Sequence, residues 1–244
     1  MSPGDGIYAC VILTLAYFLR GISGFGSGLV AVPLLAVFFP LPLVVPTMLL
    51  LDFTASLLLG GLNLQHVRRD EVKPLVPFGI VGVVLGTTLL INLPKTALLI
   101  GLGVFVLVFA IRSLLNLHGN KPVSRWWALP ASFAGGTIGA LFGTGGPPYV
   151  IYLSHRLREK GQLRATLSGV FFLEGLARIA SFITTGLLLK TQVWIAYVSG
   201  LPIALLALYG GNHVHTGLSQ SQVTRMMGGL LLLSSLSLFV KALA

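Results

Sequence analysis

Charged residues are scarce in this chain, and acidic residues are the scarcest of all. Its 244 residues include 16 Lys and Arg but only 6 Asp and Glu, and 55% of all residues are hydrophobic. The surface of a soluble domain of this length needs more charge than this. The composition therefore excludes an ordinary soluble domain and predicts an all-α membrane protein that crosses the bilayer several times.

Cysteine is almost absent as well. Cys10 is the only one, which excludes an internal disulfide and the CxxC pair of a membrane thiol–disulfide carrier. The histidines come without an HExxH motif or a cysteine cluster, so we expect no metal ion and no cofactor. A net charge of +10 would indicate nucleic acid as the partner of a soluble protein. Here the basic residues lie in short loops beside apolar segments, where they set the orientation in the bilayer, and we expect no nucleic acid.

Apolar segments alternate with these loops along the whole chain. Two of them, 7–39 and 126–154, are too long for one crossing, since 7–39 would be about 50 Å long as one helix at ~1.5 Å per residue. Glycines interrupt both, and the pieces of 7–39, roughly 14 and 11 residues, are too short to cross ~30 Å of hydrocarbon. We expect each to enter the membrane, break and return as a re-entrant hairpin. The other segments have ordinary spanning lengths: 42–64, 74–92, 95–116, 165–189, 192–211 and 222–243.

The two glycine-rich breaks are copies of each other. FGSGLVAVP at 25–33 aligns with FGTGGPPYV at 142–150, and LLLDF at 49–53 aligns with FFLEG at 171–175. Each half of the chain then holds one hairpin and three spans, which is an odd number of crossings. The sequence therefore predicts two inverted-topology repeats, a plan of secondary transporters in which the site lies at the interface of the repeats. The predicted repeats are residues 1–120 and 121–244.

The basic residues indicate the orientation. If 126–154 returns to its own side, nearly all loop Lys and Arg share one face, and only Lys95, Lys190 and Lys241 lie on the other. If it crosses, the two faces are almost equal, so the positive-inside rule favours the return. We therefore expect cytoplasmic basic loops and both termini on the outer face. The N-terminal segment lacks the basic start and cleavage site of a signal peptide, and we expect it to be retained.

The breaks contain the groups from which a site for a small anion can be built. In the second break, glycines let the backbone turn sharply, and Pro147 and Pro148 suit the first turn of a new helix. The positive end of that helix would face the break. Close helix packing through small-xxx-small glycines is the alternative explanation. We expect the substrate region to contain Ser23, Gly24, Phe25, Gly26, Ser27 and Gly28 in the first break and Gly143, Thr144, Gly145, Gly146 and Pro147 in the second.

Charged side chains within apolar segments cost several kcal/mol unless they are paired or face water. Those inside the predicted spans or at their inner ends are Arg20, Asp52, Glu174 and Arg178. Glu174 and Arg178 form a same-helix ion pair in one interpretation. In the other, Arg178 attracts the anion and Glu174 takes a proton. Arg20 either faces the anion or pairs with Asp52, and Asp52 either couples protons or makes a structural hydrogen bond.

The motifs GISGFGSGLVAVPLL and GGTIGALFGTGGPPYVIYL resemble the duplicated motif of the TauE/SafE sulfite-exporter family of bacterial membrane proteins. The resemblance extends over the length, the number of segments and the LLLDF stretch. It implies proton-driven export of small sulfur-containing anions, such as sulfite or organosulfonates, across the inner membrane. By position, the two breaks would be the substrate region, with Ser27 and Thr144 where the family frequently has glycine.

These patterns together predict an inner-membrane transporter of a small oxyanion that works by alternating access. An enzyme is disfavoured, because the sequence shows no Ser/His or paired-carboxylate arrangement at matched membrane depth. A passive anion channel, a uniporter of another small oxyanion and a non-transporting assembly factor remain alternatives. The preferred anion, the direction of transport and the oligomeric state stay open.

Overall fold

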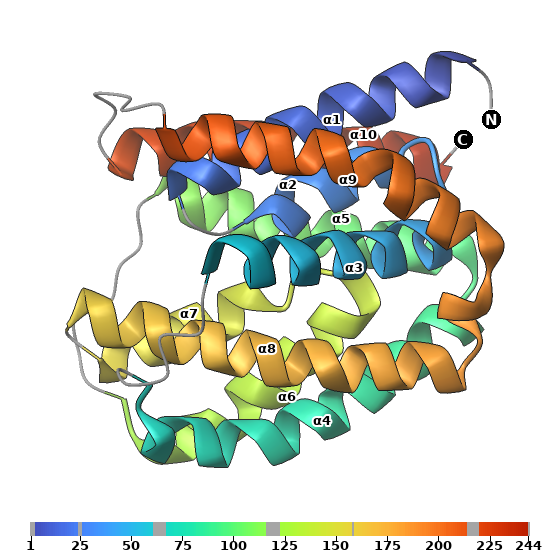
Figure 1. Cartoon of the computed structure of the whole chain (residues 1–244). Helices are drawn as coiled ribbons and strands as arrows, with labels where there is room; N and C mark the ends of the chain where they lie inside the picture. The colour runs from blue at the N-terminus through green and yellow to red at the C-terminus, as the bar shows by residue number, and fades with distance from the viewer. Residues whose placement is uncertain are drawn as a thin grey trace. The chain divides into compact units, whose positions relative to one another are not determined.

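The computed structural model describes residues 3–23, 26–60, 67–115, 123–157, 159–213 and 220–243, and these ranges contain helices and no strand (Figure 1). The predicted all-α class is confirmed. The α-helices are α1 (Pro3–Ser23), α2 (Ser27–Ala36), α3 (Leu41–Gly60), α4 (Arg69–Asn92), α5 (Lys95–Leu114), α6 (Ala128–Phe142), α7 (Gly146–Arg156), α8 (Lys160–Thr184), α9 (Thr191–His213) and α10 (Gln220–Leu243). Two short 3-10 helices, η2 (Arg125–Trp127) and η3 (Leu187–Leu189), precede α6 and α9.

Among the described residues, 6 helices are long and apolar enough to cross a membrane. These are α1, α3, α4, α5, α8 and α9, and all but α1 coincide with predicted spans of ordinary length. The last predicted span, 222–243, is occupied by α10, whose stretch Gly228–Ala242 is a shorter apolar helix. The helix lengths thus support a multi-pass membrane protein.

The first glycine-rich segment breaks later than predicted. α1 has 21 residues, and its stretch Gly4–Ile22 is long enough to cross alone, so the expectation of two pieces too short to cross was wrong for the first piece. The helix continues through Gly21, and this glycine serves packing, since a Cβ there would lie 2.6 Å from the carbonyl oxygen of Leu208 on α9. The chain breaks near Gly26 instead, and α2 has only 10 residues.

The second segment divides into two short helices, as predicted. α6 has 15 residues and α7 has 11, so both fall below the ~20 residues of a spanning helix. The return of either hairpin to its own side of the membrane stays a prediction.

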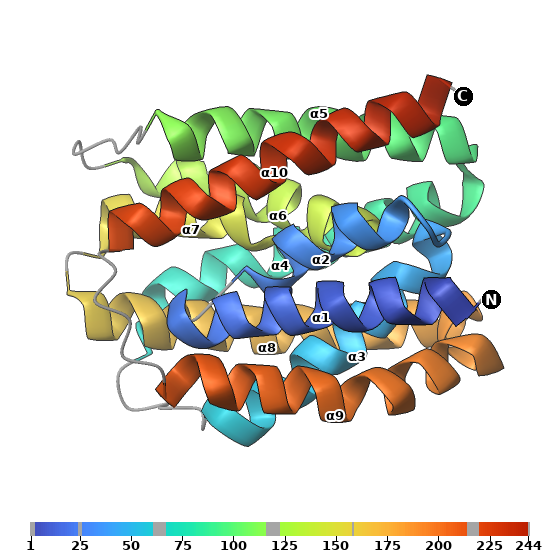
Figure 2. The ribbon, with the colours of Figure 1, turned by 90° about the horizontal axis from the view of Figure 1, so that it is seen from above.

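The helices form two compact units, each described here by itself. Unit 1 comprises Met1–Leu51, Leu93–His118 and Thr191–Ala244, and unit 2 comprises Asp52–Asn92 and Gly119–Lys190. In unit 1, α1 packs along α9 and α5 along α10, while α2 contacts α1, α5 and α10 (Figure 2). In unit 2, α4 packs along α6 and α8, and α7 lies against α6 and α8. Each unit draws on both halves of the sequence, and the division into repeats at residue 120 stays a prediction.

Glycines allow one helix pair of each unit to approach closely. A Cβ at Gly82 of α4 would overlap the carbonyl oxygen of Phe133 on α6, and Gly86 meets the α6 backbone in the same way. In unit 1, a Cβ at Gly211 of α9 would overlap the carbonyl oxygen of Phe18 on α1. Small residues let two helix backbones approach this closely inside a membrane. Gly82 and Gly86 therefore serve helix packing.

The α4–α6 seam can be tested with Gly82→Val. The branched side chain would meet backbone, which cannot move aside, so we expect a loss of about 1–3 kcal/mol of stability from overpacking. Gly229→Val is the matched control, because no atom of the described residues lies within 4 Å of a Cβ at Gly229. Thermal unfolding of the purified protein in detergent measures both variants. Equal melting temperatures for Gly82→Val and the control would contradict the seam.

Candidate functional site

Each break contains one glycine in the left-handed region. Gly26 has φ 96° and ψ 7°, and Gly143 has φ 68° and ψ 9°, so both are left-handed, a region in which glycine lacks the Cβ penalty. These glycines occupy equivalent positions in the predicted repeat. The residues that follow them, Ser27 and Thr144, are 2% and 5% exposed. The predicted interruptions are confirmed as breaks in the helices, whereas their role in binding stays a prediction.

In the first break, Arg20 reaches from α1 to the start of α2. Its Nη1 donates a hydrogen bond to the Ser27 hydroxyl at 3.3 Å, and its guanidinium lies 5.9 Å from the ring centre of Tyr17. A cation in the last turn also suits the negative end of α1. Gly28 is buried in the first turn of α2, and Ser23 is the last residue of α1. Gly24 and Phe25 lie outside the described residues.

In the second break, fewer backbone donors are available than a helix start normally provides. The Gly143 N–H donates to the Gly139 carbonyl at 2.9 Å, which ends α6, and α7 begins at Gly146. Pro147 and Pro148 lie in the first turn, as predicted, but proline has no N–H. Of the first three residues of α7, only Gly146 therefore offers a backbone donor. The hydroxyl of Thr144 is buried and has no hydrogen-bond partner among the described residues.

Glu174 and Arg178 of α8 lie beside this second break. Glu174 is 5% exposed, and its Oε1 lies 3.7 Å from the Nε of Arg178, so the same-helix ion pair is present. Arg178 also donates from Nη1 to the carbonyl of Gly139 at 3.1 Å, close to the end of α6. Neither Glu174 oxygen, nor Arg178 Nε, makes a hydrogen bond within the described part of the chain. The pair is therefore buried and incompletely satisfied.

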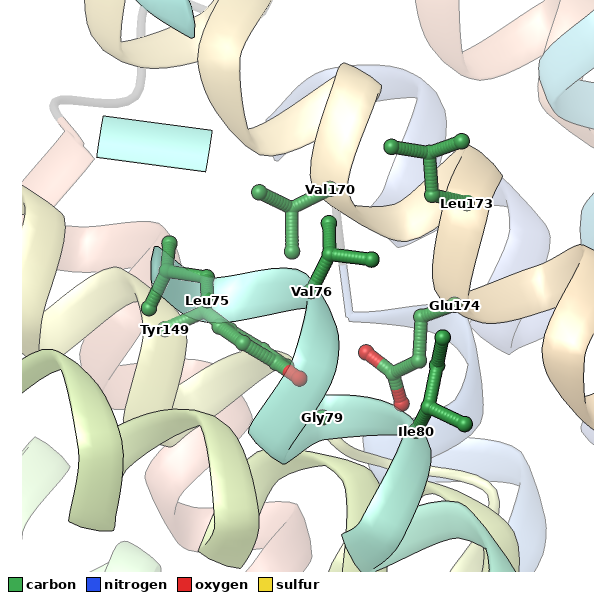
Figure 3. A pocket seen from close by; sticks show the side chains of 8 residues that line it. All are labelled: Leu75, Val76, Gly79, Ile80, Tyr149, Val170, Leu173 and Glu174. Carbon is green, nitrogen blue, oxygen red and sulfur yellow. The ribbon is translucent and has the colours of Figure 1, made fainter. Parts of the chain in front are cut away.

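Glycines around Glu174 and Tyr149 leave room for these two side chains. A Cβ at Gly139 would overlap Glu174 Oε1, one at Gly145 would lie 3.0 Å from it, and one at Gly135 would overlap the Tyr149 ring. The Tyr149 hydroxyl donates to the backbone carbonyl of Ser132 at 3.2 Å. Figure 3 shows this hydroxyl and the Glu174 carboxylate pointing toward one another. The glycine spacing in α6 thus serves a buried carboxylate and an aromatic side chain.

Asp52 differs from Glu174 although the two are aligned in the predicted repeat. Asp52 is half-buried on α3, whereas Glu174 is buried on α8. The Ser56 hydroxyl donates to the backbone carbonyl of Asp52 at 2.7 Å. Arg20 and Asp52 belong to different units, and a pairing between them stays a prediction.

The sequence analysis missed the side chains that hold the far ends of the two short helices. The Lys241 ammonium of α10 donates to the carbonyls of Ala36, at 3.3 Å, and Val37, which terminate α2. At the end of α7, Arg156 bonds to Glu71 of α4 through Nη2 at 2.7 Å and Nε at 3.2 Å. Lys241 thus supplies a hydrogen-bond partner for the last carbonyls of α2, and Glu71 anchors the end of α7 through Arg156.

Glu71 gathers further partners. It is 4% exposed, accepts a hydrogen bond from the Tyr152 hydroxyl at 2.8 Å, and lies 3.6 Å from the Nε of Arg125. These partners come from segments far away in the sequence, so no local spacing pointed to them. Among the described residues, no group of three or more His, Cys, Asp or Glu side chains could hold a metal ion.

Long apolar helices, a broken helix in each unit and a buried charged pair beside one break are features of helical membrane transporters. Residues 9–238 match the family described as sulfite exporter TauE/SafE, and the chain belongs to this family. A similar protein is the probable inner membrane transporter protein TsaS of Comamonas testosteroni, which is 31% identical over 193 residues, or 78% of this chain and 80% of TsaS. No solved structure matches the chain. The resemblance seen in the motifs is confirmed.

Glu71 and its partners Tyr152, Arg156 and Arg125 form the Glu71 cluster. This cluster predicts a large effect of Glu71→Ala on stability. Removing one partner of a buried pair leaves an uncompensated charge, and because Arg156 keeps some contact with water we expect the lower end of the usual range, about 3 kcal/mol. Asp70→Ala, at the exposed neighbouring residue, removes the same charge and should change little. Thermal unfolding in detergent compares the two, and an equal loss in both variants would contradict the cluster.

Proposed function

We propose that this transporter moves small sulfur-containing anions, such as sulfite or organosulfonates, across the inner membrane by alternating access and together with protons. The observation that carries the proposal is the second break, where Thr144, Glu174 and Arg178 have buried polar atoms without hydrogen-bond partners among the described residues. Such atoms are uncommon in proteins and call for a ligand, an ion or water. The family's description as sulfite exporters supports the class of anion.

Different kinds of donor would hold an anion at the second break. Arg178 supplies a positive charge, Thr144 supplies a hydroxyl, and Gly145 and Gly146 supply N–H groups at the positive end of α7. Because the following prolines lack N–H groups, Arg178 and Thr144 carry more of the binding than the backbone does. Removal from water strengthens each of these interactions.

Glu174 couples a proton to the anion in this proposal. An ionised Glu174 opposes anion binding, since two like charges about 5 Å apart repel by about 3 kcal/mol at an effective dielectric constant of 20. Protonation removes this repulsion and frees Arg178, whose Nε lies 3.7 Å from Glu174 Oε1. The anion and the proton therefore bind together, and the sum of their gradients sets the direction of transport.

The first break takes part in the same transport cycle, as one of two inverted repeats. The left-handed conformations of Gly26 and Gly143, at aligned positions, support this relation. So does the exchange of helices, because α1 of the first half packs on α9 of the second, and α6 of the second half packs on α4 of the first. The basic loops lie in the cytoplasm and both termini on the outer face in this arrangement.

Efflux from loaded proteoliposomes tests the function. We expect saturable efflux of sulfite or of an organosulfonate, with sulfate as the control anion, and faster efflux when the loaded side is more acidic. Protein-free liposomes correct for leakage of uncharged sulfur dioxide. Saturable flux without a pH response would replace the coupled carrier by a uniporter, and non-saturating flux would replace it by a channel. Absence of flux for every sulfur anion would overturn the function.

Substitution at the breaks tests the site in the same assay. Gly26→Leu places a leucine in a left-handed conformation, which costs about 1–3 kcal/mol of backbone strain. Gly145→Leu introduces a Cβ that would lie 2.9 Å from the Cα of Gly139. We expect each variant to insert into the membrane and to lower the initial rate by about tenfold or more, equivalent to ~1.4 kcal/mol. Gly229→Leu is the control. Normal flux in both Gly26→Leu and Gly145→Leu would contradict a substrate site at the breaks.

The coupling residue can be identified by its effect on the pH response. Glu174→Gln mimics the protonated carboxyl, so we expect flux that no longer responds to the pH gradient. Asp52→Asn is the matched variant at the aligned position and should keep the response. The reverse pattern would assign coupling to Asp52, and an intact response in both variants would remove both carboxylates from the coupling step.

A further inference from the structure

A small cavity lies against Glu174 within unit 2. Its volume of about 10 Å³ is close to that needed by one water molecule. Tyr149 and Glu174 contribute polar groups to its lining, and their oxygens point into the same space in Figure 3. Gly79 of α4 leaves this space open, because a Cβ there would lie 2.8 Å from the Tyr149 hydroxyl oxygen. A water molecule in the cavity would have partners on two helices.

A larger cleft of about 610 Å³ lies beside this cavity, between α4 and α8. Arg69 and Lys73, both exposed, contribute to its lining from the first turns of α4. Charged side chains of this kind reach for water at the end of a span, so they mark the aqueous end of the cleft. Val76 and Leu173 line both the cleft and the small cavity. Two apolar side chains thus stand between an open cleft and the space beside Glu174.

Within unit 2, the described neighbours of Glu174 lie on several sides of its carboxylate. Arg178 on the same helix and Tyr149 on α7 are the charged and titratable groups that act on it. The α6 side is closed by Gly139, whose Cβ would overlap the carboxylate, and Gly145 of the break lies against it as well. Residues of α4 line the small cavity together with Glu174.

We infer that the cleft between α4 and α8 is the route by which water and protons reach Glu174, and that Val76 and Leu173 form an apolar gate in it. The inference rests on the proposed role of Glu174 in proton coupling. Narrow apolar constrictions in membrane proteins open and close by wetting and dewetting. When the gate is wet, a proton passes from the cleft to the water beside Tyr149 and then to the carboxylate. The proton comes from the Arg69 and Lys73 face, whereas the anion occupies the break.

Cysteine labelling tests the route without relying on transport. Replacing Cys10 by Ser removes the only cysteine of the chain, and single cysteines are then introduced as Leu173→Cys and Glu174→Cys. A membrane-impermeant methanethiosulfonate reagent is applied to right-side-out and inside-out vesicles. We expect both cysteines to react from the face that carries Arg69 and Lys73, with the cysteine at 174 reacting more slowly because it lies behind the gate.

Leu176→Cys is the matched control for this experiment. Leu176 is exposed on the same helix but lines neither the cleft nor the small cavity, so its cysteine should resist the hydrophilic reagent. Labelling at 174 from the opposite face only, or at neither 173 nor 174, would overturn the route. This holds whether or not the protein transports sulfite, so a failed route and a failed function give different results.

A second measurement tests the gate itself. Leu173→Trp makes a gating side chain bulkier and narrows the passage, and we expect a lower rate of pH-driven efflux with an unchanged anion concentration at half-maximal rate. Leu173→Ala opens the gate and should raise the labelling rate of Glu174→Cys in the same chain, because that cysteine lies behind the gate. An unchanged efflux rate in Leu173→Trp, or an unchanged labelling rate in the paired variant, would contradict the gate.

Discussion

Inside a membrane, polar groups cannot form hydrogen bonds with bulk water. This constraint applies to the helix breaks and to the buried polar side chains of this protein. An interrupted helix exposes backbone groups that must find partners within the protein. Here Arg20 bonds across the first break, Lys241 bonds to the last carbonyls of α2, and Arg156 anchors the end of α7 to Glu71. Against this background, Thr144, Glu174 and Arg178 have buried polar atoms without hydrogen-bond partners among the described residues, which supports the proposed anion site.

The two breaks share a left-handed glycine and differ in chemistry. Ser27 and Thr144 follow glycines of the same left-handed conformation, yet the Ser27 hydroxyl accepts a bond from Arg20, whereas the Thr144 hydroxyl has no partner among the described residues. The carboxylates differ in the same way, with Asp52 half-buried and Glu174 enclosed. In the proposed repeat, the two breaks thus differ in polarity, and an asymmetric transport cycle would need such a difference.

The helices, their breaks and the charged pair in α8 could be predicted because each depends on local sequence. Apolar length, glycine position and the i,i+4 spacing of Glu174 and Arg178 are visible in the chain itself. The end of α1 could not be placed, since Gly21 looks like a helix breaker until its contact with α9 is known. The Glu71 cluster was missed for the same reason, because its partners come from α7 and η2. The space that glycines leave around Glu174 likewise depends on how α6, α7 and α8 pack.

The exchange of helices between the halves also orders events during synthesis. The α4–α6 pair, with α7 and α8, lies within Asp52–Lys190, so all the segments of unit 2 have been made before α9 begins at Thr191. The close contact between α1 and α9 depends on Gly211 of α9. α1 can therefore pack against α9 only after most of the chain has been translated. Unit 2, which contains Glu174, can therefore assemble first. The N-terminal helix α1 completes its packing among the last of the helices.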